Sequence, residues 1–153
     1  MFGAISFAKA AGRKFSGLFK GKKAKETLEK EVNDLGLNSE GVDIHVDDEG
    51  KVTISGNAVS QEMKEKIILA VGNVSGVGEV TDEAGAADGG AASQFHEVVS
   101  GDTLWAVSKK YYGKGSRYME IFEANKPMLS HPDKIYVGQM LRIPADSKDT
   151  ASV

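Results

Sequence analysis

The most constraining feature of this chain is a stretch at residues 83–93 that holds no large apolar side chain and consists mostly of glycine and alanine. Such a stretch cannot join a hydrophobic core, so it predicts a flexible linker. Once a basic start is set aside, about 60 residues precede it and about 50 follow it, close to the smallest size of an independent core. The sequence therefore predicts two small domains, with the boundaries 1–22 (basic N-terminal segment), 23–83 (first domain), 84–93 (flexible linker), 94–146 (second domain) and 147–153 (disordered tail).

Composition excludes several chemistries at once. The 153 residues include no cysteine, which rules out disulfides, cysteine-bound zinc, iron–sulfur clusters and thiol catalysis. The three histidines, His45, His96 and His131, show no metal-ligand spacing. No apolar run reaches the roughly 18 residues that a membrane-spanning helix needs, so we expect no integral membrane segment.

Charge is distributed unevenly along the chain. Residues 1–25 carry seven Lys or Arg and no acid, whereas the rest holds 12 bases against 22 acids, a formal charge of −10. Affinity for phosphate comes mainly from clustered basic side chains. The acidic body therefore predicts that nucleic acid is not a partner.

The N-terminal segment places apolar side chains at helical spacings, with Lys and Arg between them. This pattern predicts an amphipathic helix, interrupted at Gly12 and Gly17, that packs on the first domain. A helix on a membrane surface and a part of a ligand site are the alternatives. A secretion signal needs an unbroken apolar core after its basic start, and here Lys9 interrupts the apolar run. We therefore expect a cytoplasmic protein.

Residues 23–83 combine helical and alternating patterns. The expected elements are helices at 23–36 and 60–72 and strands at 42–46, 52–55 and 79–82. Ser60 is a favourable N-cap for the second helix. This α-β-β-α-β order, with the segment VSGVGEV at 74–80, resembles a BON domain over residues 24–83. The resemblance implies a small module of a kind found in proteins that bind phospholipid or other ligands.

The second domain carries a more specific pattern. The segments that carry it are 95–108 (which includes GDTLW), 118–127 and 135–144 (IYVGQMLRIP). We expect Asp102 to cap a helix over 103–112, Gly113 to end that helix, and Ser116 to begin a second helix. The expected core residues are Leu104, Ile121, Ile135 and Leu141. The pattern resembles a LysM domain of β-α-α-β order, so the whole chain is predicted to be an α+β protein.

The LysM resemblance implies one function of its own. Domains of this family usually bind glycans that contain N-acetylglucosamine, such as peptidoglycan or chitin. The groove would lie between the loops at 101–104 and 125–129. A cytoplasmic chain does not meet that polymer, so glycan binding by an envelope protein is the alternative function and not the first.

Catalytic motifs are missing from the sequence. It contains no Walker loop, no nucleophile-elbow glycine pattern and no paired carboxylates in an identifiable cleft. The fragment Gly76-Val77-Gly78 follows a predicted helix, whereas a dinucleotide-binding fingerprint must follow a strand. We therefore expect no enzymatic activity.

One BON-like domain followed by one LysM-like domain is similar to the small bacterial cytoplasmic potassium-binding proteins. The matching segments are 60–62, 65–67, 70–73 and 123–129. The resemblance implies a K⁺ sensor or buffer that closes around its ion. The expected cofactor and partner is K⁺, and the expected oligomeric state is a monomer.

The location of the ion site can be argued from carbonyl groups. K⁺ suits rings of neutral backbone carbonyls, whereas clustered carboxylates favour calcium or magnesium. The last carbonyls of a helix have no partner within the helix, and glycines let the following chain curl. The second helix of the first domain ends in this way, and the N-terminal helix breaks at 11–13; the family resemblance points to the same two segments. The predicted ligands are the carbonyls of Ala8, Ala11, Arg13, Gly72, Val74 and Val77. The alternative is a glycine-rich turn against a docked helix, with no ion.

Overall fold

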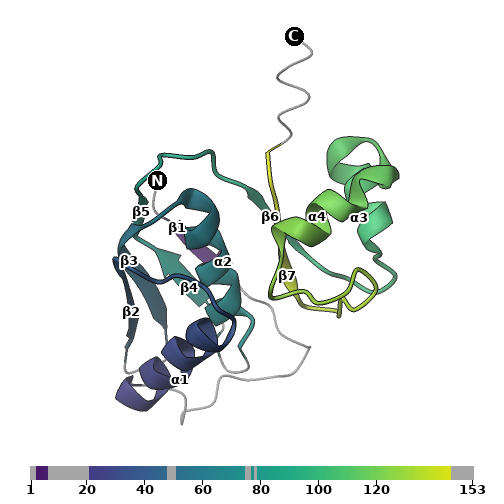
Figure 1. Cartoon of the computed structure of the whole chain (residues 1–153). Coiled ribbons are helices and arrows are strands. Elements are labelled where there is room, and N and C mark those ends of the chain that lie inside the picture. The colour runs from purple at the N-terminus through teal and green to yellow at the C-terminus, as the bar shows by residue number, and fades with distance from the viewer. Residues whose placement is uncertain (1–2, 7–20, 48–50, 75–76, 78, 146–153) are drawn as a thin grey trace.

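A computed structural model describes residues 3–6, 21–47, 51–74, 77 and 79–145 of the chain. These residues form two bodies that mix helices and strands, which confirms the α+β prediction (Figure 1). Within the described residues, no helix is long and apolar enough to cross a membrane.

The first domain is a sheet with two helices packed against it. Its helices are α1 (Gly21–Asp34) and α2 (Gln61–Gly72), and its strands are β1 (Gly3–Ser6), β2 (Val42–Val46), β3 (Val52–Ala58), β4 (Glu79–Asp82) and β5 (Gly85–Ala86). The strand order is β1-β4-β3-β2, with β5 paired to β3. Strands β3 and β4 are parallel and are joined by α2, whereas β2 pairs antiparallel with β3 and β1 pairs antiparallel with β4. The predicted α-β-β-α-β order is therefore present, with two additional strands.

Helix α2 is buried along most of its length because its apolar residues are not confined to one stripe. The consecutive residues Ile67 to Val71 are all at most 4% exposed. The helix begins as predicted: the Ser60 hydroxyl accepts a hydrogen bond from the Met63 backbone N–H at 3.0 Å. A helix that is apolar on several sides needs a second surface besides its sheet. The second domain supplies that surface.

Strand β1 corrects the prediction for the N-terminal segment. Residues 3–6 pair antiparallel with β4, with Ile5 opposite Val80, instead of forming the start of an amphipathic helix. One side of β4 pairs with β3. Without β1, the backbone groups on the other side of β4 would be unpaired, and the short extended segment 3–6 pairs with them. The glycine in this segment also disfavours a helix. The rest of the predicted helix, residues 7–20, lies outside the described residues.

The start of the predicted linker differs from its expected character. Ala84 is 2% exposed and belongs to the first-domain core, and the Lys64 ammonium donates to its carbonyl at 3.0 Å. Strand β5 then pairs with β3, with Gly85 opposite Asn57. The expectation that nothing here joins a core is wrong for Ala84, because a small side chain is buried where the surrounding backbone is held by the sheet. The mobility expected of residues 84–93 stays a prediction.

The second domain packs helices against a two-stranded sheet. Its elements are β6 (Gln94–Glu97), α3 (Leu104–Tyr112), the 3₁₀-helix η1 (Gly115–Arg117), α4 (Tyr118–Ala124) and β7 (Met140–Ile143). Strands β6 and β7 are antiparallel. The predicted core residues Leu104, Ile121 and Leu141 are buried, and Ile135 is partly buried against them.

Two helix boundaries in this domain differ from the prediction. The residue that caps α3 is Thr103, whose hydroxyl accepts from the Ala106 N–H at 3.1 Å. The Asp102 carboxylate instead accepts from the Val99 N–H and contacts His96 Nε2, both at 2.9 Å. The second helix begins as the 3₁₀ turn η1 and becomes α-helical only at Tyr118. The predicted end of α3 is confirmed, because Gly113 adopts a φ of 79° there.

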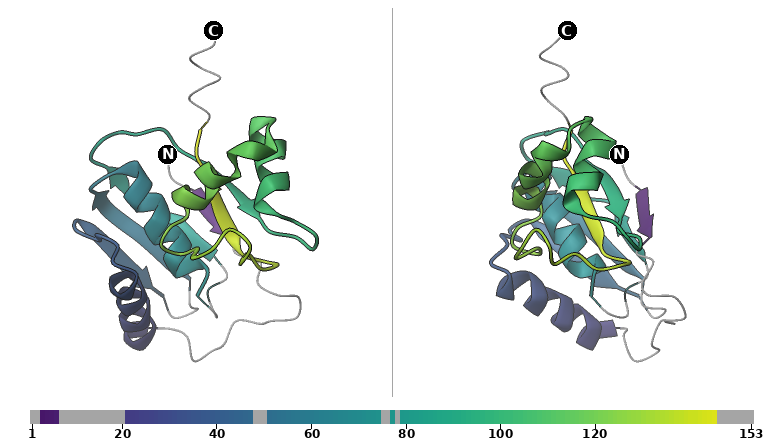
Figure 2. Two further views of the ribbon diagram at one scale, coloured as in Figure 1. Left: turned by 45° about the vertical axis from the view of Figure 1, so that its right-hand side comes forward. Right: turned by 90° about the vertical axis from the view of Figure 1, so that its right-hand side faces the viewer.

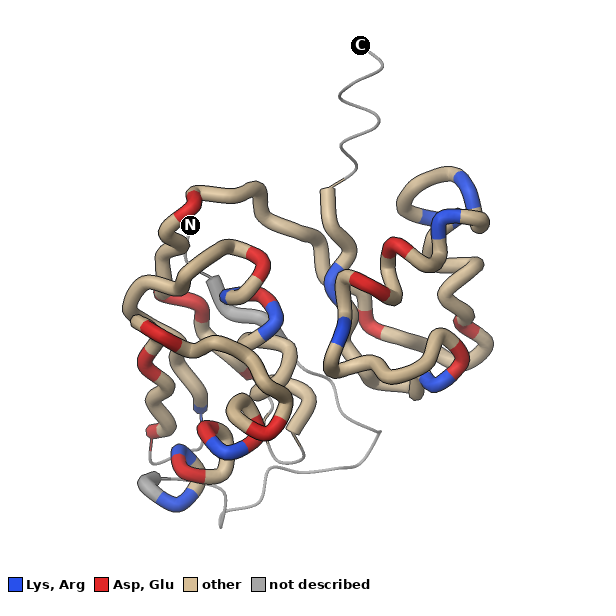
Figure 3. The backbone as a smooth tube through the Cα atoms, in the orientation of Figure 1, with Lys and Arg blue, Asp and Glu red and all other residues tan. Residues whose placement is uncertain are grey.

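The two domains share an apolar junction along α2. Met140, the first residue of β7, belongs to the core cluster of the first domain, and Phe95 and Met128 pack against the same cluster. Strand β7 lies beside α2 in each view (Figure 2). Acidic and basic positions are interspersed over the described parts of both domains (Figure 3).

Candidate functional site

The last residue of α2 and the turn that follows it hold three of the six predicted ligands. The Asn73 N–H still bonds back to the Leu69 carbonyl, and the Val74 N–H bonds to the Val71 carbonyl at 3.2 Å. The Val74 carbonyl accepts from the Val77 N–H at 3.1 Å. Since a carbonyl oxygen has two lone pairs, this bond leaves the Val74 oxygen able to face a cation as well. The chain thus curls tightly after the helix, as predicted.

The structure brings Gly72, Val74 and Val77 into one turn, whereas Ala8, Ala11 and Arg13 lie outside the described residues. Val77 is fully buried, and the side chain of Val74 packs against the first-domain core. The strand register adds one further relationship. Ser6, the last residue of β1, pairs with Glu79, which follows Val77 by two positions. Strand β1 therefore ends beside this turn.

The chemistry of the turn is that of neutral oxygen donors. Among the described residues, no group of three or more His, Cys, Asp or Glu side chains could hold a metal ion. A pocket of about 340 Å³ opens between α1, α2 and the second domain, and its lining includes Asn73, Val74 and Gln139. A cation at this end of α2 would also meet the negative end of the helix dipole. The described arrangement therefore offers a cation the backbone and amide oxygens and the helix dipole, and the Glu31 side chain lines the same pocket.

The side chain of Asn73 connects this turn to the second domain. Its Oδ1 accepts from the Met140 N–H at 3.1 Å, and its Nδ2 donates to the Met140 carbonyl at 3.2 Å. One amide group thus satisfies both backbone groups of a single strand residue. Asn73 directly follows the predicted helix at 60–72, and nothing in the sequence pattern predicted a role for its side chain.

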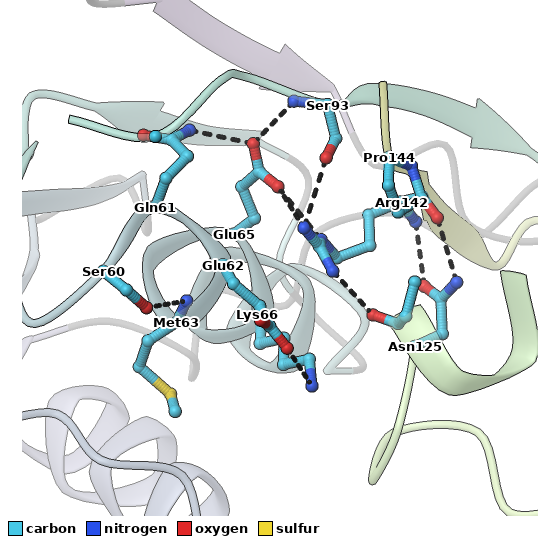
Figure 4. A network of polar contacts seen from close by, with 12 residues as sticks. Ser60, Gln61, Glu62, Met63, Glu65, Lys66, Ser93, Asn125, Arg142 and Pro144 are labelled. Carbon is cyan, nitrogen blue, oxygen red and sulfur yellow. Dashed lines mark hydrogen bonds and ion pairs between the residues drawn. The ribbon is translucent and has the colours of Figure 1, made fainter. Parts of the chain in front are cut away.

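A buried ion pair crosses the junction farther along α2 (Figure 4). The Arg142 guanidinium lies 2.8 Å from the Glu65 carboxylate, and the two side chains are 7% and 3% exposed. Gln61 and the Ser93 N–H donate to the other Glu65 oxygen at 2.8 and 2.7 Å. Arg142 also donates to the Ala124 carbonyl at 3.0 Å. Every buried polar side-chain atom among the described residues has a partner.

These contacts determine the ionisation of Glu65. Burial alone would raise the pKa of this carboxyl group, because it disfavours the charged form. Hydrogen bonds from Gln61, Ser93 and Arg142 outweigh burial and hold the pKa of Glu65 below its usual value. The pair is therefore ionised at neutral pH.

Sequence reasoning missed this pair, although one signal was present. Glu65 precedes Ile68 and Leu69 by about one helical turn, so the residues that follow it on its face of α2 are apolar. An acid in such a position needs a cationic partner from elsewhere in the chain. The sequence does not indicate which base that is, because Arg142 follows 77 positions later.

The LysM-like domain has a pocket of its own, with a volume of about 420 Å³. It is lined by Thr103, Leu104, Trp105, Tyr118, His131, Pro132 and Asp133. The first predicted loop of a glycan groove, 101–104, therefore contributes to it, but 125–129 does not. Met128 packs against the first domain and Leu129 is buried in the second, so the opposite wall comes from 131–133 instead.

Comparison with known proteins covers nearly the whole chain. Residues 22–84 match the BON domain family, and residues 96–144 match the LysM domain family. A protein of Escherichia coli O6:H1, the potassium binding protein Kbp, is 48% identical over 149 residues. The alignment covers 94% of this chain and 99% of that protein, so both domains and their order are shared.

Proposed function

We propose that this chain, which belongs to the family of potassium binding protein Kbp, binds K⁺ and serves as a K⁺ sensor or buffer. The observation that carries the proposal is the 48% identity across both domains, together with the curled turn that ends α2. The non-catalytic domain types support a binding protein and not an enzyme. We propose that it acts in the cytoplasm.

In this proposal the ion is held by backbone oxygens. The ligands are the carbonyls of Ala8, Ala11, Arg13, Gly72, Val74 and Val77. The turn at the end of α2 and the pairing of Ser6 with Glu79 support this choice, because they place the end of β1 beside the turn. A ring of neutral carbonyls can replace the water shell of K⁺ without any acidic side chain. Enclosing the ion between two segments compacts the protein.

The test is a comparison of cations at constant ionic strength. Thermal unfolding and the radius of gyration are measured while NaCl is replaced by KCl. A ligand present at a hundred times its dissociation constant stabilises the folded state by about 2.7 kcal/mol, so K⁺ should raise the melting temperature and reduce the radius. Equal responses to both salts would refute K⁺ binding.

A deletion tests the location of the site. Removing residues 1–13 takes away three of the proposed ligands and should abolish the K⁺ response. Removing 147–153 is the matched control, because it shortens the other terminus and leaves the response intact. Ser75→Ala should matter little, since backbone atoms hold the ion. A chain without residues 1–13 that binds K⁺ as tightly as the full chain would contradict this location.

Glycan binding by the second domain is the second candidate function. The observation that favours it is the pocket at 131–133, beside which Trp105 is 52% exposed. Aromatic faces of this kind provide apolar contact area for a sugar ring. Co-sedimentation with purified peptidoglycan, compared between the parent chain and Trp105→Ala, tests it. Absence of binding by the parent chain would exclude this function.

A further inference from the structure

We propose that Asn73 is a positioning residue that couples K⁺ binding to docking of the LysM domain. This inference rests on the proposed function, because it concerns the turn to which we assign the ion. It adds a mechanism by which the second domain, which contributes none of the proposed ligands, sets the affinity of the site.

Two asparagine side chains cover the outer edge of β7. Met140 and Arg142 are two positions apart, so their backbone groups point to the same side of the strand. The Asn125 side chain covers the groups of Arg142, accepting from its N–H at 2.8 Å and donating to its carbonyl at 3.0 Å. Asn73 covers the groups of Met140 in the same way. One asparagine comes from each domain, so the edge of β7 is complete only when the domains are docked.

Asn73 lies within the turn to which we assign the ion. It lies between Gly72 and Val74, whose carbonyls are two of the proposed ligands. Its backbone N–H is held by the carbonyls of α2, while its side chain is held by β7. The orientation of the peptide groups on either side is therefore fixed from both domains. If the second domain separates, the Asn73 side chain loses its two hydrogen bonds to Met140. The carbonyls of Gly72 and Val74 are then less well preorganised for the ion.

Docking of the second domain and ion binding are thermodynamically linked. When docking favours the ion-binding geometry of the turn, ion binding must favour docking by the same factor. The contact between Asn73 and Met140 can carry this linkage because the Met140 side chain also packs in the first-domain core. Docking therefore fixes the strand residue to which the Asn73 side chain is hydrogen-bonded. The Glu65–Arg142 pair lies farther along α2 and holds the domains together without contacting the turn residues.

The experiment compares Asn73→Ala with Asn38→Ala in the full chain. Asn38 is a matched control, since it is an exposed asparagine of the first domain whose side chain accepts a local hydrogen bond from the Glu40 N–H. K⁺ is titrated against a constant background of Na⁺, with heat of binding as the readout. We expect Asn73→Ala to weaken K⁺ binding at least about fivefold, the lower end of typical coupling between sites. Asn38→Ala should stay within about twofold of the parent chain.

A second measurement reports on the contact itself. Amide exchange of Met140, whose N–H is held by Asn73, should slow when K⁺ is added to the parent chain. The Gly113 amide, which ends α3 away from the junction, is the internal reference and should not respond. Because it uses the parent chain, this measurement tests the coupling even if Asn73→Ala does not fold.

The outcomes separate the two proposals. A parent chain that ignores K⁺ refutes the proposed function and this inference with it. A parent chain that binds K⁺ while Asn73→Ala binds it equally well overturns the coupling and leaves the function intact. Exchange at Met140 that is unaffected by K⁺ in the parent chain overturns the coupling as well.

Discussion

Glu65 and Arg142 form a buried ion pair between two domains, 77 positions apart in the sequence. Bringing two charges out of water is costly. Hydrogen bonds that Gln61 and Ser93 donate to Glu65, and one that Arg142 donates to the Ala124 carbonyl, offset that cost. A pair of this kind contributes geometric specificity to the junction. It requires α2 and β7 to meet in one register.

Removing one partner of the pair should destabilise the protein strongly. Glu65→Ala leaves the Arg142 guanidinium buried without its counter-charge, which costs about 3–5 kcal/mol. The double variant Glu65→Leu/Arg142→Met should recover much of that loss, because both charges are removed together. Urea unfolding measures the free energies. Lys66→Ala, which breaks the more exposed pair with Glu62, is the control and should cost at most about 1 kcal/mol. If Glu65→Ala and Lys66→Ala reduce the free energy of unfolding equally, Glu65 and Arg142 do not form a buried pair that the fold depends on.

The same carboxylate should make the stability of the junction depend on pH. The pKa of Glu65 is lower in the folded protein than in the unfolded chain, so the folded state stabilises the ionised form. That contribution is fully present above the ordinary glutamate pKa and is lost as the pH falls through the lowered value. Glu65→Gln should therefore show a shallower loss of stability between neutral and acidic pH. Parallel pH profiles for the variant and the parent chain would count against this prediction.

Residues 84–93 should show two kinds of motion. Ala84 is buried and strand β5 pairs with β3, so backbone order parameters at 84–86 should equal those of the sheet. Ser93 is held by Glu65 at the other end. Between these anchors, we expect nuclear magnetic relaxation to show increased motion at 89–92, which are exposed glycine and alanine residues. Uniform rigidity across 84–93 would show that this is no linker.

Sequence periodicity predicted the elements whose partners are local or whose apolar pattern is long. Helix α2 and its Ser60 cap follow from side-chain spacing and from one hydroxyl group, and both are present. The cap of α3 was placed one residue early, because aspartate and threonine are both good N-caps and stand side by side there. Strand β1 was missed because four residues do not distinguish a helical from an extended period.

The junction could not be predicted for a different reason. Asn73 and Met140 are 67 positions apart, and neither residue type indicates that an amide will pair with the backbone of a strand. The proposed ion site is an intermediate case. Helix-end chemistry and the family resemblance indicate where it would lie, and three of the six proposed ligands fall at the end of α2 and in the turn after it. Local physical rules thus give the two domains, whereas the contacts between them depend on the assembled fold.

Gly115 should be intolerant of a side chain because Trp105 rests on it. A Cβ atom at this position would overlap the indole ring, and the Lys109 ammonium lies over the same ring at 5.5 Å from its centroid. Since the ring is half exposed, Gly115→Ala should push it outward and cost about 1–3 kcal/mol of stability, as overpacking does elsewhere. Trp105 is the only tryptophan in the chain, so its fluorescence emission reports the displacement directly. Ser116→Ala, at the exposed neighbouring position, should leave both emission and melting temperature unchanged. If Gly115→Ala leaves both unchanged too, the indole does not rest on Gly115 in solution, and the wall that Trp105 gives to the LysM pocket must be placed differently.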